Sequence, residues 1–132
     1  MATTRWSPGL ETGHPLVDEQ HRRLFDMVEE FESPGKDRPS ALRMVEDIMA
    51  HVDDHFSCEE ALMDEVGYPL RDREAHISEH AELKEQARQL VLGLRSGGGA
   101  GTAEIAEYLT RWLVRHTTMQ DMSLVRFIAE RS

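Results

Sequence analysis

Apolar residues recur along this chain at steps of three and four, which is the spacing of one face of an α-helix. Four segments show the pattern, at about residues 15–33, 40–66, 70–95 and 102–131, and they are separated by SPGKDRPS, Gly67-Tyr68-Pro69 and SGGGAG. Helices joined by such short connections pack as antiparallel neighbours. The sequence therefore predicts an all-α protein, an antiparallel up-down four-helix bundle that forms a single domain over residues 1–132.

Residues at the ends of these segments favour particular helix boundaries. Pro15 suits a first helical position, and Gly67 suits a C-terminal cap. We expect Thr102 to cap the last helix, with Glu104 in its first turn, where a carboxylate interacts favourably with the helix dipole.

Composition excludes several classes of partner. The formal net charge is −10, whereas binding to nucleic acid or to an anionic membrane requires clustered Lys and Arg. Cys58 is the single cysteine, so no internal disulfide forms. No stretch has the length and apolar character of a membrane span, and the first residues lack the pattern of a signal peptide. We expect a cytoplasmic monomer, in which any signalling role requires a separate protein partner.

Histidines and carboxylates interrupt the apolar stripes at positions where leucine is expected. His55 and Glu59 are four residues apart, as are His76 and His80, so each pair lies on one helix face. The complete set is His21, His55, Glu59, His76, His80, His116 and Asp121. Burying these groups without compensation would cost several kcal/mol per group. The net free energy of unfolding of a small domain is of that size, so the domain could not sustain the cost for the whole set. A bound metal removes that conflict, because it coordinates the groups.

The donor set limits the choice of metal. Five imidazole nitrogens and two carboxylates suit a pair of first-row transition ions, and so many histidines exclude the oxygen-only ligation of calcium or magnesium. Cys58 is rotated off the face of Glu59 and offers no thiolate ligand. The paired Glu-x-x-His motifs of ferritin-like bundles are missing. These arguments leave zinc and manganese open beside iron.

Several short motifs resemble those of the bacterial hemerythrins. They are Thr12-Gly13-His14-Pro15, Asp18-Glu19-Gln20-His21, His55-Phe56 followed by Glu59-Glu60, Tyr68-Pro69, His76-x-x-x-His80, and Trp112-Leu113-x-x-His116-x-x-x-x-Asp121. The resemblance extends from Trp6 to about Phe127, and the order of the ligand-type residues makes it highly specific.

The resemblance implies a non-heme di-iron protein that binds dioxygen reversibly. His76, His80 and His116 would be the terminal ligands of one iron, and His21 and His55 would bind the other iron, which keeps an open position for dioxygen. Glu59 and Asp121 would bridge the two iron ions together with an oxo or hydroxo group. The implied role is that of a carrier, store or sensor of oxygen, not of an enzyme.

Two features of the last helical segment complicate the transfer of these family roles to this sequence. His116 and Asp121 are five residues apart, about 140° around an ideal α-helix, which requires a local bulge or a carboxylate that reaches sideways. Thr117 stands where the family commonly has an isoleucine beside the oxygen pocket, of which Trp112 and Leu113 are candidate walls. A hydroxyl there would admit water and shorten the life of the oxygen adduct.

Other interpretations remain open at this stage. His14 is expected to be a surface or capping residue, and His51, one turn before His55, is expected to lie outside the ligand set. A di-iron enzyme, such as a peroxidase or a nitric oxide-handling protein, is the first alternative function. The second is an iron-holding or structural bundle without a gas-binding role.

Overall fold

Helices account for all the regular secondary structure in the computed structural model, which describes residues 8–97 and 101–131. The elements are η1 (Pro8–Leu10), α1 (Pro15–Glu32), α2 (Arg38–Val66), α3 (Leu70–Ser96), α4 (Thr102–His116), the π-helix η2 (Thr117–Asp121) and α5 (Met122–Arg131). No strand occurs in these ranges. Residues 1–7, with Trp6, and residues 98–100 of the predicted last connection lie outside the described part.

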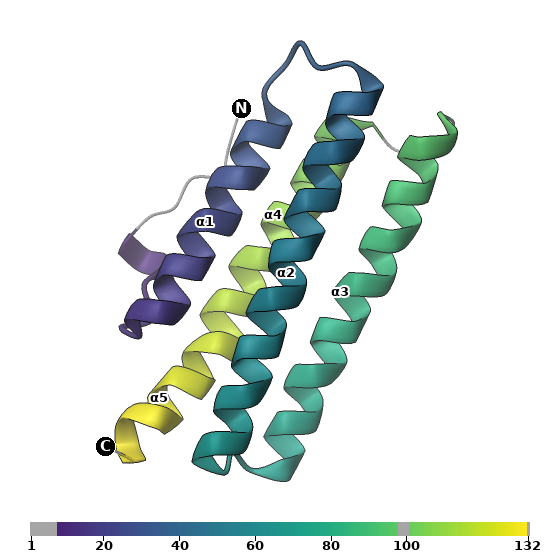
Figure 1. Cartoon of the computed structure of the whole chain (residues 1–132). Helices are drawn as coiled ribbons and strands as arrows, with labels where there is room; N and C mark the ends of the chain where they lie inside the picture. Colours follow the sequence, from purple (N-terminus) through teal and green to yellow (C-terminus); the bar gives the residue numbers. More distant parts are fainter. Residues whose placement is uncertain (1–7, 98–100, 132) are drawn as a thin grey trace.

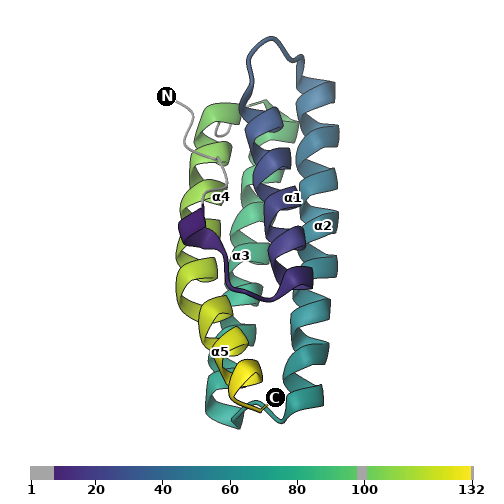
Figure 2. The same cartoon turned by 90° about the vertical axis from the view of Figure 1, so that its left-hand side faces the viewer.

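The long helices alternate in direction and form a four-helix bundle (Figure 1). α1 packs against α2 and α4, and α3 packs against the same two helices, so α1 and α3 are diagonal neighbours. η2 and α5 continue the line of α4, so the three elements together occupy the place of the fourth helix (Figure 2). The all-α bundle predicted from the apolar periodicity is confirmed.

The start of one helix and the N-cap of another differ from the predicted ones. α2 begins at Arg38 instead of Ser40, because the Asp37 side chain caps the helix by accepting a hydrogen bond from the Ser40 N–H at 2.8 Å. The N-cap of α4 is Gly101, not Thr102, and the Glu104 carboxylate accepts a hydrogen bond from the Gly101 N–H at 3.0 Å. The predicted cap of α2 at its other end is confirmed, since Gly67 adopts a left-handed φ of 66°.

The fourth helix is interrupted at the step of five residues that the sequence analysis singled out. Residues Thr117–Asp121 form a π-helix, in which the Met122 N–H donates a hydrogen bond to the Thr117 carbonyl five residues earlier. The wider π turn brings residues five apart closer to one face than an α-helix does. Of the two expected solutions, the structure uses the local bulge.

Apolar side chains form two separate clusters along the bundle. The larger one is built from all four long helices and contains Leu24, Phe25, Val28, Phe31, Val45, Ile48, Val52, Phe56, Leu83, Leu94, Ile105, Leu109, Trp112 and Leu113, among others. The smaller one, near the α2–α3 turn and α5, contains Met63, Tyr68 and Leu124. The predicted metal ligands lie between these clusters along α2 and along the α4–α5 line.

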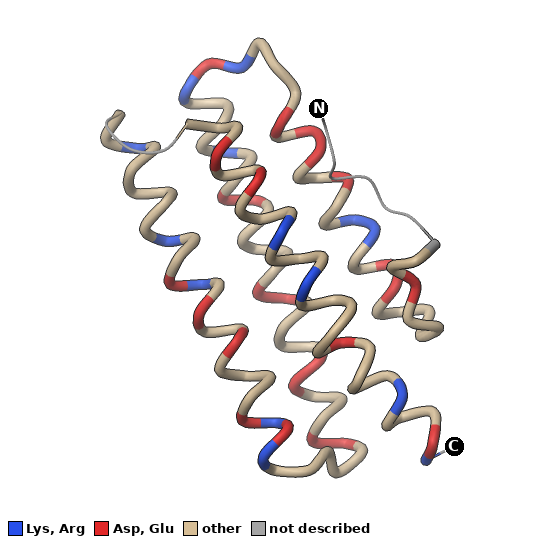
Figure 3. Tube along the Cα trace, turned by 180° about the vertical axis from the view of Figure 1, so that it is seen from behind, with Lys and Arg blue, Asp and Glu red and all other residues tan. Residues whose placement is uncertain are grey.

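Charged residues of both signs are distributed along the helices (Figure 3). The chain has 25 Asp and Glu against 15 Lys and Arg, and in the coloured part of Figure 3 the basic residues are interspersed with acidic ones. Among the described residues, no helix combines the length and the apolar character that crossing a membrane requires.

Candidate metal centre

The side chains that interrupt the apolar stripes meet at one level of the bundle. They are His21 from α1, His55 and Glu59 from α2, His76 and His80 from α3, His116 from α4, and Asp121 from η2. None of them is more than 2% exposed. The structure therefore brings together all seven residues of the predicted set, from every long helix.

Their ligand-type atoms fall into two groups, and within each group the atoms lie within 4.8 Å of one another. The three-histidine group comprises His76, His80 and His116, and the two-histidine group comprises His21 and His55. Glu59 and Asp121 belong to both groups.

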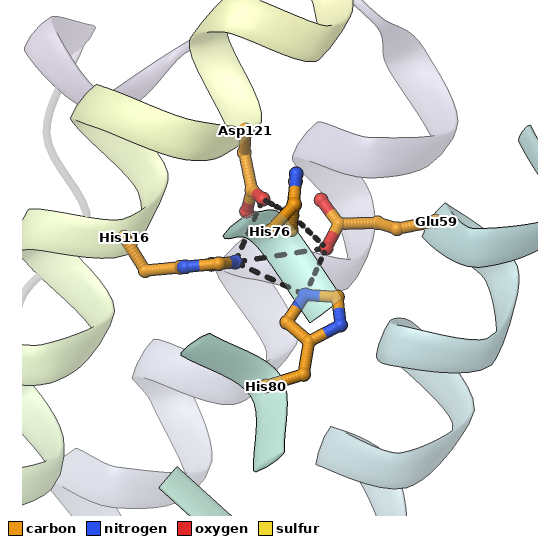
Figure 4. A group of neighbouring side chains, drawn as sticks. All are labelled: Glu59, His76, His80, His116 and Asp121. Carbon is orange, nitrogen blue, oxygen red and sulfur yellow. Dashed lines mark hydrogen bonds and ion pairs between the residues drawn. The ribbon is translucent and has the colours of Figure 1, made fainter. Parts of the chain in front are cut away.

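In the three-histidine group, the ring nitrogens converge on the carboxylate of Glu59 (Figure 4). The Glu59 Oε1 atom lies 3.1 Å from His80 Nε2 and 3.3 Å from His76 Nε2. The Nε2 atoms of His80 and His116 are themselves 3.2 Å apart. All three rings thus present Nε2 to one small volume beside a carboxylate.

In the two-histidine group, the same pattern is built from the first two helices. The Nε2 atoms of His21 and His55 are 3.0 Å apart. The second oxygen of Glu59, Oε2, lies 3.5 Å from His55 Nε2. Glu59 therefore presents one oxygen to each histidine group.

Asp121 is divided between the groups in the same way. Its Oδ1 atom lies 3.0 Å from Nε2 of both His76 and His116, and its Oδ2 atom lies 2.7 Å from His21 Nε2. A carboxylate that presents one oxygen to each of two donor sets has the arrangement of a bridging ligand. The π-helix makes this possible, because it places Asp121 beside His116 despite the step of five.

The outer nitrogens of three rings have partners that the sequence analysis missed. His55 Nδ1 lies 2.6 Å from the amide oxygen of Gln20. His80 Nδ1 lies 3.1 Å from a carboxylate oxygen of Glu60, and His116 Nδ1 lies 2.9 Å from one of Glu79. All three partners are chain neighbours of predicted ligands, namely Gln20 of His21, Glu60 of Glu59 and Glu79 of His80. A hydrogen-bond acceptor directly next to a predicted ligand in the sequence is the signal from which these three partners could have been predicted.

These outer contacts determine what the inner nitrogens can do. The acceptors are oxygens without a hydrogen to donate, so each neutral ring donates from Nδ1 and leaves a lone pair on Nε2. Lone pairs of His80 and His116 then face each other and the Oε1 atom of Glu59 at about hydrogen-bond distance, with no hydrogen between them. Such an arrangement is repulsive unless a cation occupies its centre. The residues therefore fit a metal, and the donor set fits first-row ions.

Without a metal, protons take the place of the cation. Burial, together with the carboxylate of Asp121, raises the pKa of Glu59 well above its ordinary value. Burial acts against the ionised form of Asp121 as well, but hydrogen bonds from Glu59 and His116 hold the pKa of Asp121 well below its usual range. Although burial opposes it, the Asp121 and Glu59 carboxylates raise the pKa of His116 to about 9. At neutral pH, metal binding must therefore displace protons from this cluster.

The pKa of His80, in the same three-histidine group, is shifted in the opposite direction to that of His116. Burial and the neighbouring imidazoles of His116 and His76 lower the pKa of His80 to about 2. Burial likewise lowers the pKa of His55. These two rings are therefore neutral, as ligation requires, before any metal arrives.

Aromatic rings cover the cluster on the side of the larger apolar core. Phe56 stacks on His80 with ring centroids 3.6 Å apart, and Trp112 stacks on His116 at 4.3 Å. Leu113 is buried, and Thr117 is 1% exposed. The pocket roles assigned to Trp112, Leu113 and Thr117 stay predictions, but each side chain is buried within about one turn of the predicted ligand His116.

The two remaining histidines lie outside the cluster. His14 is the N-cap of α1, and its Nδ1 accepts a hydrogen bond from the Val17 N–H at 3.4 Å. His51 is half-buried and accepts a hydrogen bond from Arg23 Nε, also at 3.4 Å. Neither belongs to a metal-binding group, as expected.

Known proteins resemble the chain over almost its whole length. A family model described as "Hemerythrin HHE cation binding domain" matches residues 12–128. A bacteriohemerythrin of Pseudomonas aeruginosa is 28% identical over 127 residues, which cover 95% of this chain and 81% of that protein. A bacteriohemerythrin of Stenotrophomonas maltophilia is 27% identical and covers 93% of this chain, which in turn spans 80% of that protein.

Solved structures agree with the sequence comparisons. The crystal structure of a wild-type hemerythrin superposes with a TM-score of 0.82 at 26% identity, covering 92% of this chain and 94% of the other. That of a hemerythrin variant gives a TM-score of 0.86 at 25% identity, covering 96% and 98%. With its four-helix bundle and its buried histidine–carboxylate cluster, the chain belongs to the hemerythrin family.

Proposed function

We propose that this protein holds two iron ions in the cluster and binds dioxygen there reversibly, as a carrier, store or sensor. The three-histidine group would hold one ion and the two-histidine group the other. Glu59 and Asp121, with an oxo or hydroxo group, would bridge them. The ion held by His21 and His55 would have fewer protein ligands than the other, which would leave it able to bind dioxygen.

The observation that carries this proposal is the division of each carboxylate between the two histidine groups. A site for one ion needs no second set of nitrogens on the far side of Glu59 and Asp121. Two carboxylates and five neutral imidazoles leave a pair of divalent or trivalent ions with residual positive charge, which favours adding an anionic ligand such as reduced oxygen. The relatives named bacteriohemerythrin and hemerythrin support iron as the metal.

Bound iron would supply the electrons for the reversible reduction of dioxygen, and the protein would supply the surroundings. The rings of Phe56 and Trp112 cover the histidines and exclude water on the side of the larger core. Leu113 adds a buried apolar wall. Water exclusion keeps bound oxygen from being protonated and lost as peroxide, so these side chains favour release of dioxygen over reaction.

The visible spectrum of the purified protein tests the proposal. Iron content should be two ions per chain, and the reduced protein should form a coloured adduct in air that disappears when oxygen is removed. Several such cycles should be possible. A colourless protein containing zinc would contradict the assignment of iron.

One feature favours an enzyme as the alternative function. The side chain of Thr117 carries a hydroxyl, yet it is 1% exposed and follows His116 directly. A hydroxyl at that place can bring a proton to bound oxygen, which would promote peroxide chemistry. If no reversible adduct forms and peroxide is instead consumed with turnover, the enzyme alternative replaces the carrier.

A further inference from the structure

The Nδ1 partners of His80 and His116 differ in charge from that of His55, and this difference suggests that the two metal positions have different properties. A difference between two metal positions rests on the proposed function, because it requires a metal ion in each group. In the described residues, two rings of the three-histidine group contact a carboxylate through Nδ1, and one ring of the two-histidine group contacts a neutral amide.

Glu79 is held in place from two directions. Its Oε1 atom accepts the hydrogen bond from His116 Nδ1 at 2.9 Å, and its Oε2 atom accepts one from Gln120 Nε2 at 3.0 Å. Gln120 lies in the π-helix, directly before Asp121. The carboxylate thus links α3 to the end of α4 and to η2, which carry the predicted ligands His116 and Asp121, and its side chain is only 29% exposed.

Glu60 plays the corresponding part for His80. It follows Glu59 on α2, but points to the outer edge of the cluster, where its Oε2 atom lies 3.1 Å from His80 Nδ1. Its side chain is 37% exposed, so water screens this contact more than that of Glu79. We therefore expect Glu79 to have the larger influence on the metal.

Gln20 stands behind the two-histidine group and differs from both in charge. Its amide oxygen lies 2.6 Å from His55 Nδ1, which fixes the ring in the same tautomer as the others. The amide adds no negative charge, however. A carboxylate in this position makes imidazole a stronger donor to a metal than an amide does, because it stabilises positive charge on the ring.

We propose that Glu79 and Glu60 are positioning residues that make the three-histidine position the tighter of the two metal sites and favour the more highly charged iron there. Gln20 leaves the two-histidine position weaker and its ion easier to exchange or to reduce. The two ions would thereby be unequal even though they share both carboxylate bridges.

Competition between the protein and a chelator for Fe²⁺, measured without oxygen, tests this proposal. Wild-type protein should bind two ions with different affinities. Glu79→Gln keeps an oxygen acceptor for His116 but removes the charge, and it should weaken the tighter site by about 10–100-fold. Glu60→Gln should have a smaller effect in the same direction. Gln20→Glu should strengthen the weaker site, so that the two affinities converge.

Glu74→Gln is the matched control, since Glu74 is exposed on the same helix as Glu79 and its replacement changes net charge equally. The control should leave both affinities unchanged. Melting of the metal-free proteins should fall further in Glu79→Gln than in Glu74→Gln, because Glu79 also pairs with the protonated His116, and these curves measure the effect on folding separately from the effect on the metal. The midpoint potential of the iron should rise in Glu79→Gln and stay constant in Glu74→Gln.

The outcomes distinguish this proposal from the function on which it rests. If wild-type protein binds two ions, but Glu79→Gln and Glu74→Gln give the same affinities and the same potential, the positioning role is wrong and the di-iron site stands. If wild-type protein binds fewer than two ions, the di-iron proposal itself fails and this one fails with it.

Discussion

Asp121 shows how much of the site depends on the placement of single atoms. Its two oxygens face different histidine groups: Oδ1 lies 3.0 Å from His76 Nε2, and Oδ2 lies 2.7 Å from His21 Nε2. That Asp121 belongs to the set could be predicted from the sequence, because its spacing from His116 matches the motif of the bacterial hemerythrins. The sequence could not predict which oxygen faces which ring, because that depends on how four helices are rotated against one another.

The ligand assignment predicts which histidines matter for iron content. His76→Ala removes a buried ring nitrogen from the three-histidine group and should reduce iron per chain sharply. His51→Ala removes a half-buried ring outside both groups and should leave the iron content almost unchanged. Metal analysis of the purified variants is the measurement. Equal iron loss in the two variants would show that the cluster is not the iron site.

Thr117 is predicted to limit the life of the oxygen adduct. Thr117→Ile replaces a buried hydroxyl with hydrocarbon, so it should keep water and protons from bound oxygen and slow autoxidation. The rate at which the coloured adduct decays to inert iron(III) measures this. Thr118→Ile is a suitable control, because the Thr118 side chain is exposed and its hydroxyl bonds to the Val114 carbonyl. Decay that is equal or faster in the Thr117 variant would mean that the hydroxyl is not the weak point.

At the scale of elements, the first turn of α1 is secured by a carboxylate. Asp18 accepts hydrogen bonds from the Thr12 N–H at 2.8 Å, the Thr12 hydroxyl at 2.7 Å and the Gly13 N–H at 3.0 Å. These bonds tie the segment before the helix to its first turn. Asp18 is only three residues from His21, so the same contacts help to fix the helix end that carries a predicted ligand.

The contacts of Asp18 predict a dependence of stability on pH. Burial acts to raise the pKa of Asp18, but the hydrogen bonds from Thr12 and Gly13 outweigh it and hold the pKa below the ordinary 3.8. The folded state therefore gains stability from the ionised carboxylate above the ordinary pKa and loses it as pH falls through the lowered one. At neutral pH, Asp18→Asn should lower the free energy of unfolding by about 1 kcal/mol.

Denaturant titrations of both chelated proteins at several pH values measure this difference, because chelation removes the separate effect of acid on metal ligation. The gap between wild type and Asp18→Asn should close as the carboxylate of the folded protein becomes protonated. A gap that stays constant down to the lowest pH would show that the charge is not the cause.

The elements themselves could be predicted in part. Apolar periodicity located all four long helices to within two residues at most ends, because each buries a continuous stripe. The start of α2 and the cap of α4 were wrong, because the Asp37 side chain caps α2 two residues earlier than expected, and Gly101, which has no side chain, is the N-cap of α4 in place of Thr102. Sequence spacing showed that the fourth helix needed a distortion near Asp121, but not that it would be a π-helix.

At the scale of the whole molecule, a polar cluster separates two apolar ones. The larger apolar cluster spans the four long helices, and the smaller one comprises residues near the α2–α3 turn and α5. Between them, seven polar side chains from every long helix face one another with almost no exposure to water. A metal ion at this level would join four helices that are otherwise held by apolar contacts and by shared protons.

Removal of the metal should therefore lower the melting temperature. A ligand that binds only the folded state adds about 4 kcal/mol when its concentration is a thousand times Kd, which corresponds to roughly 15 °C for a domain of this size. Calorimetry of the iron-loaded and the chelated protein measures the shift. Acid should act in the same direction, because protonated imidazoles cannot ligate. A melting temperature that does not change on chelation would contradict the buried metal site.

The contact between His21 and Asp121 has a consequence for the order of events in the cell. The two residues are 100 positions apart, and Asp121 belongs to both metal-binding groups. On the ribosome, neither metal position is complete until all four long helices have been synthesised. A metal ion that requires the complete set of predicted ligands would therefore bind only after all four long helices have been synthesised, and until then apolar contacts and shared protons would hold the helices together.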